Sequence, residues 1–252
     1  MVETIVVVGG GSAGWITANL LNAHCRRAGR NTSITLVESP DIPTIGVGEA
    51  TVPTIRRTLN DIGLPEQDVL TSAEATFKTL IRFKDWNLGE SYDHPFDRRR
   101  RPQTDSAVGR WTAQNNLSFD RSFSALTQLA DHNIAPKAPR HPQYQGSFPY
   151  AYHLDAIKLA NRLAAFGRER GIVHTLANVT DVKVSSEGLI ESVQTDRGDS
   201  LTADLYIDCT GFRSALLGGA LGVKMKSFAK YLLCDRAVTM RIPYDVHTPE
   251  RI

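Results

Sequence analysis

A glycine-rich turn near the N-terminus has the residue types and spacing to hold a phosphate group. The stretch Gly9-Gly-Gly-Ser-Ala-Gly14 matches the pattern G-x-G-x-x-G and follows a β-branched run, Thr4–Val8. Gly9 permits a tight turn, Gly11 lets the backbone approach a pyrophosphate, and Gly14 allows a helix to pack closely on the strand. Ordinary turns also contain such glycines, so the prediction of a ligand depends on the neighbouring elements.

Two neighbouring elements favour a dinucleotide site over an ordinary turn. Trp15–Arg27 has apolar residues at helical spacing, with Gly29 as its stop, so a helix should begin directly after the turn. The N-terminus of that helix offers free N–H groups and a partial positive charge to a pyrophosphate. A second strand, Ser33–Glu38, ends in an acid, and Glu38 would accept hydrogen bonds from the ribose hydroxyls of an adenosine.

The stretch after the second strand favours FAD over NAD as the dinucleotide. An NAD-binding domain usually continues into further βαβ repeats, whereas Pro40–Pro53 is irregular and marked by glycine and proline. Such a segment lies either over a ligand or on the surface as a plain loop, and a ligand is the stronger reason for ordering it. The later pattern, in which antiparallel strands lead to Asp208-Cys-Thr-Gly211, also suits a flavoprotein.

Strand and helix signals alternate in the first and last parts of the chain, and the first βαβ crossover should be right-handed. The later signals predict a helix at Leu154–Arg170, a strand at Val173–Val184, a hairpin around Asp196–Asp199 and a buried strand at Leu205–Asp208. The predicted fold class is therefore α/β with α+β elements. It has an FAD-binding, Rossmann-type βαβ core with antiparallel strands, like that of flavin monooxygenases.

Residues 85–150 differ from the rest of the chain. They hold six of the 12 prolines and three of the 7 histidines, and their periodicity is weak. We expect loops and short helices there, as a substrate-side segment inserted into the first domain. Residues 1–252 are then expected to form one FAD-binding, flavin-monooxygenase-like domain.

The overall composition argues against several classes of protein. Hydrophobic residues make up 41% and charged residues 22% of 252, which is typical of globular proteins. The formal charge of +2 argues against nucleic-acid or membrane partners, so the run Arg98–Arg101 is interpreted as a solvated loop. The three cysteines are far apart, which predicts neither disulfides nor a metal site and fits a cytoplasmic protein.

Several motifs together resemble the flavin-dependent halogenases of the tryptophan halogenase type. The resemblance runs in order along nearly the whole chain, although residues 98–145 match poorly. The strap pattern G-V-G-E-A-T-x-P and an F-K pair are not shared by ordinary aromatic hydroxylases. The motifs are Gly9–Trp15, Ile45–Pro53, Phe77-Lys78, Phe83–Trp86, Tyr152–Asp155 and Asp204–Ser214.

The resemblance implies a definite chemistry. Members of the family take FADH2 from a separate flavin reductase and react it with O2 to give a flavin hydroperoxide, which a halide ion attacks to yield hypohalous acid. A lysine next to the substrate holds this oxidant as a haloamine or by hydrogen bonding. A small aromatic substrate, usually an indole such as tryptophan, is then chlorinated or brominated by electrophilic substitution.

The catalytic lysine of the family falls on Lys78. Residue types alternate across Ala75–Trp86, and if this stretch is a strand, Lys78 shares a face with Leu80, Arg82 and Lys84. Desolvation or neighbouring positive charge would lower the lysine pKa below its reference of about 10.4. The neutral amine is the form that reacts with an electrophilic halogen. The alternative interpretation is a solvated lysine on a basic strand edge.

The remaining site residues also follow from the resemblance. His94 and Phe96 correspond to a histidine and aromatic pair that lines the substrate pocket, although a structural loop histidine is the alternative. Asp155 is expected to be a helix cap rather than a catalyst. The expected cofactor contacts, on the glycine turn, the second strand, the strap and an adenine-contacting valine, are Gly9, Gly11, Ser12, Ala13, Gly14, Trp15, Glu38, Gly48, Glu49, Ala50, Thr51 and Val179.

Two other functions stay open, a class A flavin aromatic hydroxylase and a non-catalytic FAD-binding module. The family carries a W-x-W-x-I-P signature further along, and Trp15, Trp86 and Trp111 do not have this spacing. The resemblance therefore implies that the FAD-binding domain 1–252 is incomplete at its C-terminus, and we expect weak or no turnover from these residues alone. The exact substrate, the regioselectivity, the preference for chloride or bromide and the formation of a homodimer also stay open.

Overall fold

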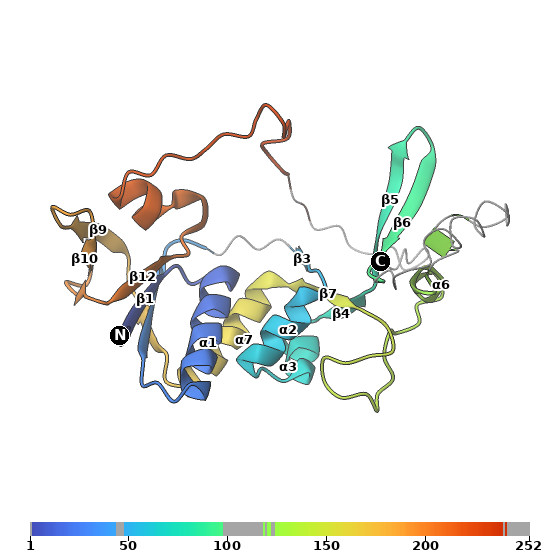
Figure 1. Cartoon of the computed structure of the whole chain (residues 1–252), viewed down its shortest axis with the longest axis horizontal. Helices are drawn as coiled ribbons and strands as arrows, with labels where there is room; N and C mark the ends of the chain where they lie inside the picture. Colours follow the sequence, from blue (N-terminus) through green and yellow to red (C-terminus); the bar gives the residue numbers. More distant parts are fainter. Residues whose placement is uncertain are drawn as a thin grey trace. The chain divides into compact units, whose positions relative to one another are not determined.

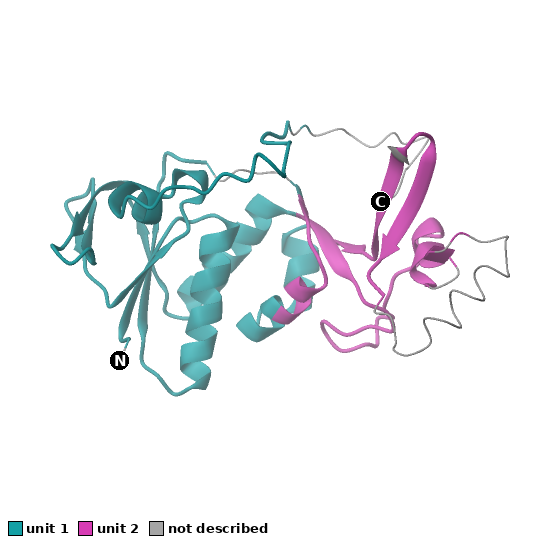
Figure 2. Ribbon diagram, turned by 45° about the horizontal axis from the view of Figure 1, so that its top comes forward, with its two compact units in different colours: residues 1–48, 58–74, 155–242 teal, residues 49–57, 75–154, 243–252 magenta. Residues whose placement is uncertain are grey.

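The computed structural model describes residues 2–43, 48–97, 118, 120–121, 124–238 and 240, which form two compact units (Figure 2). Unit 1 contains residues 1–48, 58–74 and 155–242, and unit 2 contains residues 49–57, 75–154 and 243–252. Two stretches interpreted above, Arg98–Arg101 and Ile45–Val47 of the strap, lie outside the described residues. Among the described helices, none has the length and apolar character needed to cross a membrane.

Unit 1 is built on a four-stranded parallel sheet of order β12-β1-β2-β8. The central strands are β1 (Thr4–Val8) and β2 (Ser33–Glu38), and the edges are β12 (Leu205–Asp208) and β8 (Val173–Leu176). β-Branched residues make up all of β1, and most of this strand is buried, as strands covered on both faces should be. The predicted α/β class is confirmed, and the carboxyl ends of the strands share one edge of the sheet.

Two helices of unit 1, α1 (Ser12–Arg27) and α7 (Ala156–Glu169), lie side by side (Figure 1). The buried side chain of Asn19 on α1 donates a hydrogen bond to the carbonyl oxygen of Leu163 on α7 at 3.0 Å. Asp155 caps α7, as predicted, because its carboxylate accepts from the backbone N–H of Lys158 at 3.0 Å.

Two short helices, α2 (Thr54–Ile62) and α3 (Glu66–Ser72), follow the strap in the sequence. Arg162 on α7 forms an ion pair with Asp68 on α3 at 2.7 Å, with both side chains partly exposed. This pair fixes α3 against the long helix that begins close to the glycine turn.

A second sheet of unit 1 is antiparallel, with the order β11-β10-β9. Its strands are β9 (Val179–Val184), β10 (Ile190–Thr195) and β11 (Ser200–Leu201). The short elements η1 (Gly211–Arg213) and η2 (Ala215–Ala220) follow β12. A buried apolar cluster joins the two sheets and η2, with members Val6, Val8, Val37, Val193 and Leu216.

The prediction of a single strand at Val173–Val184 is wrong. The chain forms β8 and β9 in different sheets, and it breaks at Ala177 and Asn178. The backbone N–H of Ala177 donates to Glu38 O at 2.9 Å. The Asn178 side chain donates to Asp41 at 2.6 Å and to Asp196 at 2.9 Å. These hydrogen bonds join residues that are distant in sequence, and they turn the chain between β8 and β9. The local pattern of residues could therefore not predict the break.

Unit 2 contains a three-stranded sheet of order β3-β7-β4, made of β3 (Gly48–Ala50), β7 (Ala151–Asp155) and β4 (Thr76–Lys78). It also contains a hairpin of β5 (Leu80–Asn87) and β6 (Glu90–Pro95), and the helix α6 (Leu126–Asp131). The weak periodicity of residues 85–150 led us to expect loops and short helices. The hairpin was therefore missed.

Ala75–Trp86 does not form the single strand that its alternating residue types would allow. β4 and β5 belong to different sheets, and the break falls at Thr79, whose carbonyl oxygen accepts from Phe96 N at 3.0 Å. Arg82 on β5 forms ion pairs with Asp93 and Asp131, each at 2.7 Å, which connect the hairpin to α6. Lys78 therefore does not share a sheet face with Arg82.

Candidate functional site

The glycine turn of unit 1 forms a close-packed cradle between β1 and α1. Gly9 has a φ of +113°, and a Cβ added there would lie 2.2 Å from the carbonyl oxygen of Cys209. A Cβ added at Gly14 would lie 1.8 Å from the carbonyl oxygen of Gly9. Both positions therefore require glycine, because a side chain at Gly9 would collide with the chain directly after β12 and one at Gly14 would push α1 away from the turn.

The N-terminus of α1 has the features of an anion site. Gly11 is the N-cap, so no side chain caps the first turn, and the first turn contains no acidic residue. The N–H groups at the start of this helix are therefore left for a ligand, and the helix dipole favours a negative charge there. Ser12 donates from Oγ to Ala156 O at 3.4 Å, which brings the beginnings of α1 and α7 together.

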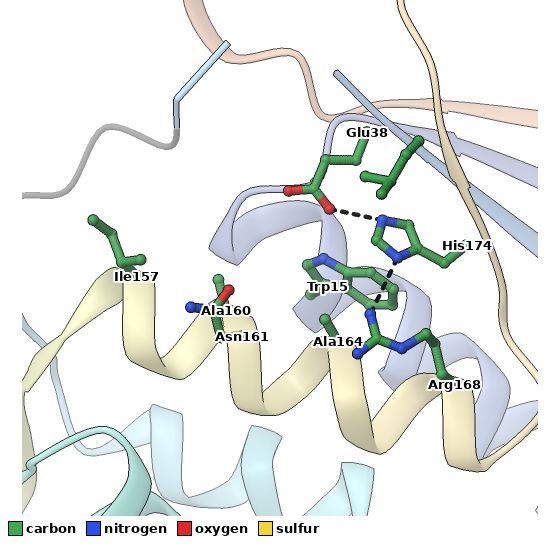
Figure 3. Close-up of a pocket in the computed structure, with 10 residues that line it drawn as sticks. Trp15, Glu38, Ile157, Ala160, Asn161, Ala164, Arg168 and His174 are labelled. Atoms are coloured by element: carbon green, nitrogen blue, oxygen red, sulfur yellow. Dashed lines mark hydrogen bonds and ion pairs between the residues drawn. The ribbon is translucent and has the colours of Figure 1, made fainter. Parts of the chain in front are cut away.

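Glu38 lies at the end of β2 with its carboxylate beside the glycine turn. Its Oε2 lies 2.8 Å from Nε2 of His174, and Nδ1 of His174 lies 3.2 Å from the Arg168 guanidinium. Figure 3 shows the other carboxylate oxygen, Oε1, pointing away from His174. Among the described residues, no hydrogen-bond donor reaches Oε1. Oε2 is thus held by His174, and Oε1 is open to a ligand.

A cavity of about 340 Å³ adjoins this carboxylate. Gly10 and Glu38 line it beside the turn, and Trp15 on α1, Arg168 on α7 and His174 on β8 also line it (Figure 3). Because an added Cβ at Gly10 would lie 2.1 Å from Cδ of Glu38, the glycine allows the acid to fold over the turn. The cavity therefore has a partly free carboxylate in its wall, next to the glycine turn.

Lys78 forms a separate arrangement in unit 2. The residue is 7% exposed, and its Nζ donates hydrogen bonds to Thr51 O at 3.1 Å and to Ala50 O at 3.4 Å. The ring centroid of Phe96 lies 5.4 Å from Nζ, within cation–π range. Burial lowers the pKa of this amine from its usual value. The interpretation as a solvated lysine on a strand edge is therefore wrong.

Thr51 fixes the end of the strap against β7. Its backbone N–H and its Oγ both donate to Tyr152 O at 2.9 Å, and its Oγ accepts from Tyr152 N at 3.0 Å. The neighbouring His153 has its pKa lowered, first by burial and then by the positive charge of Lys78. The strap, the lysine and β7 thus form one hydrogen-bonded group.

Comparisons with known proteins place this geometry in a family. The tryptophan halogenase family model matches residues 4–250. The chain belongs to the tryptophan halogenase family. The parallel sheet with its glycine turn agrees with this assignment, because the family's solved structures superpose on the described fold.

Three proteins illustrate the similarity. Tryptophan 6-halogenase SttH of Streptomyces toxytricini is 36% identical, over 97% of this chain and 50% of its own length. The 7-chloro-L-tryptophan 6-halogenase KtzR of Kutzneria sp. strain 744 is 36% identical, over 96% of this chain and 51% of its own. The structure of Tar14, a tryptophan C-6 flavin-dependent halogenase, matches 90% of this chain and 47% of its own, with a TM-score of 0.82 and 36% identity. The chain therefore spans about half the length of these tryptophan halogenases.

The structure brings together only some of the residues predicted in unit 2. Ala50, Thr51 and Phe96 gather around Lys78, whereas His94 lies on β6 opposite Ile81 with an exposed side chain. Gly48 and Glu49 precede Ala50 on β3.

In unit 1, the residues Gly9, Gly11, Ser12, Ala13, Gly14, Trp15 and Glu38 all lie at the turn or directly beside it. Val179 packs instead against the apolar cluster between the two sheets. Sequence reasoning missed Gly10, Arg168 and His174. Gly10 lies between the first two glycines of the G-x-G-x-x-G pattern, so it could have been chosen from the sequence. No local pattern of residues indicated Arg168 or His174.

Proposed function

We propose that this chain serves in an FADH2-dependent halogenase that chlorinates or brominates an electron-rich aromatic compound. The environment of Lys78 carries the proposal, because a buried amine is held on the backbone of the G-V-G-E-A-T strap. The same chain contains a glycine turn that fits a diphosphate. A class A hydroxylase would use the glycine turn but has no role for such a lysine.

The residues of unit 1 fit FAD in three respects. The turn has room only for backbone at Gly9 and Gly14, so a diphosphate can approach the N–H groups of α1. Oε1 of Glu38 is open to ribose hydroxyls, and the cavity of about 340 Å³ adjoins it. Reduced FAD, when bound, supplies with O2 the oxidising equivalents that convert a halide ion into hypohalous acid.

The amine of Lys78 is arranged to receive hypohalous acid. In the neutral amine, the nitrogen lone pair attacks the halogen, so that an N–halogen bond forms and the O–halogen bond breaks. The hydroxide leaves as water with a proton from the amine. A charged amine would instead donate a hydrogen bond to the acid. Burial lowers the pKa of Lys78, which raises the neutral share at any given pH, and the strap carbonyls fix Nζ.

The substrate, partners and location follow from the same proposal. Because the matched relatives are named tryptophan halogenases, a tryptophan-type indole is the first choice of substrate. A separate flavin reductase would supply FADH2 by diffusion. Residues 85–150 would form the substrate side of one FAD-binding domain, with Phe96 close to the amine. The three free cysteines fit a cytoplasmic location.

The proposal is tested by product analysis of the protein at the full length that its gene encodes. We expect bromotryptophan when the protein receives a flavin reductase, NADH, FAD, O2, bromide and tryptophan, identified by mass as bromine in place of one hydrogen. Product should disappear when halide is omitted. A hydroxylated product that forms without halide would instead support a class A hydroxylase. FAD binding without any product would support a non-catalytic module.

A further inference from the structure

Three side chains connect α7, β8 and β2 at the edge of the cavity in unit 1 (Figure 3). Arg168 on α7 lies 3.2 Å from Nδ1 of His174 on β8, and Nε2 of His174 lies 2.8 Å from Oε2 of Glu38 on β2. A guanidinium can only donate hydrogen bonds, so Nδ1 must accept. The ring is then the tautomer with its hydrogen on Nε2, and that hydrogen is donated to Glu38.

The imidazole has little freedom to move. The His174 side chain is only 10% exposed, and its ring meets the Trp15 ring edge-on, with centroids 4.9 Å apart and an interplanar angle of 79°. Packing and two hydrogen bonds therefore fix both its position and its direction. The Glu38 side chain is more exposed, at 28%, and it gains its fixed orientation from this ring.

We propose that His174 is a positioning residue for the cofactor. By holding Oε2 of Glu38, it leaves Oε1 facing the two hydroxyls of an adenosine ribose, and Arg168 selects the tautomer that makes this possible. This inference rests on the proposed binding of FAD. It assigns the recognition of the adenosine half of the dinucleotide to a pair from strands β2 and β8, whereas the diphosphate is held by backbone.

The inference predicts a loss of FAD affinity that depends on the ribose hydroxyls. In the full chain, His174→Phe keeps an aromatic ring beside Trp15 but removes both hydrogen bonds. We expect it to weaken FAD affinity about tenfold, the effect of losing one well-oriented hydrogen bond to a charged group. The affinity for an FAD analogue whose adenosine lacks the 2′ and 3′ hydroxyls should not change. His174→Gln, whose amide can donate to Glu38, should restore most of the loss.

Further variants separate positioning from packing. Glu38→Gln combined with His174→Phe should bind FAD no more weakly than Glu38→Gln alone, because both changes act through one carboxylate. His24→Phe makes the same substitution at an exposed position of unit 1 and should leave both affinities unchanged. If His174→Phe does not fold, Arg168→Met provides the second measurement, with a smaller loss that is again confined to FAD.

The outcomes distinguish this inference from the proposed function. Equal weakening of FAD and of the analogue would show that His174 acts only through packing and would overturn the inference alone. Unchanged FAD affinity in His174→Phe would also overturn the inference and leave the proposed function standing. If the unmodified chain binds neither ligand, the proposed FAD site itself is wrong and the inference falls with it.

Discussion

The glycine turn of unit 1 and the lysine site of unit 2 are built from different kinds of group. In the turn, backbone atoms pack so closely that side chains are excluded at Gly9 and Gly14. At the lysine site, one side-chain amine is held by carbonyl oxygens of Ala50 and Thr51, which are distant from it in sequence. In the proposed function, the turn binds a diphosphate through its backbone, whereas the lysine takes part in the reaction. The two regions should therefore fail in different ways when they are changed.

The largest effect on FAD affinity is expected when the glycine turn is filled. A Cβ at position 14 would lie 1.8 Å from Gly9 O, so Gly14→Val must displace the loop from α1. We expect FAD affinity to fall about a hundredfold or more, because the N–H groups of α1 lose their alignment. Flavin fluorescence titration measures this loss, and circular dichroism checks the fold.

Gly219→Ala is the matched control for that change. A Cβ at position 219 meets only Ser214 O, at an ordinary contact distance of 3.7 Å. This variant should bind FAD as the unmodified chain does. Equal losses in both variants would mean that the turn has no special role in binding.

A smaller effect is expected when the strap is loosened without touching Lys78. Thr51→Val removes the hydroxyl that both donates to Tyr152 O and accepts from Tyr152 N. The two lost bonds should lower the free energy of unfolding by about 1–3 kcal/mol and slow halogenation about tenfold through a misplaced amine. Urea unfolding and product formation measure the two effects.

The exposed Thr71 allows a control for the strap. Its hydroxyl donates only to Gln67 O within α3, at 2.9 Å. Thr71→Val should therefore change halogenation little. If Thr51→Val halogenates at the unmodified rate, the strap does not position the lysine.

The titration of Lys78 gives a prediction with a definite sign. Burial lowers the pKa of the folded-state amine, so the unfolded chain binds more protons and stability rises with pH. The buried charged amine destabilises the folded state. This destabilisation is fully present below the folded-state pKa and disappears above the unfolded-state pKa of about 10.4. Lys78→Met should therefore be more stable than the unmodified chain at pH 7, and this difference should shrink towards pH 10. A difference independent of pH in urea unfolding would contradict the assigned burial.

The smallest effect is expected outside both regions. Arg162 and Asp68 form a partly exposed ion pair between α7 and α3. Arg162→Gln should lower the free energy of unfolding by about 1 kcal/mol or less, because solvent screens such pairs. FAD affinity should stay the same. A large loss of FAD affinity would mean that the contact between α7 and α3 supports the glycine turn.

The same contrast explains what could be predicted from the sequence. Thr4–Val8, Ser33–Glu38 and Leu205–Asp208 were predicted with the bounds that the structure has, because runs of apolar and β-branched residues mark them locally. The breaks at Thr79 and Ala177 were missed because they depend on hydrogen bonds to residues distant in sequence.

The candidate sites divide in the same way. The glycine turn is a contiguous pattern, so its chemistry could be predicted from the residues alone. Lys78 was chosen only through the resemblance to a family, since its burial against Ala50 and Thr51 is a tertiary feature. The partner of Glu38 could not be predicted, because His174 lies 136 positions away in the chain.

The central claim is that FAD is bound by one region and that the reaction depends on Lys78 in the other. The most direct test measures FAD affinity and brominated product on the same preparation of Lys78→Met, in the protein at the full length that its gene encodes. We predict an FAD affinity within about twofold of the unmodified protein and a loss of product of about a thousandfold or more. Bromination at an undiminished rate by Lys78→Met would contradict the account.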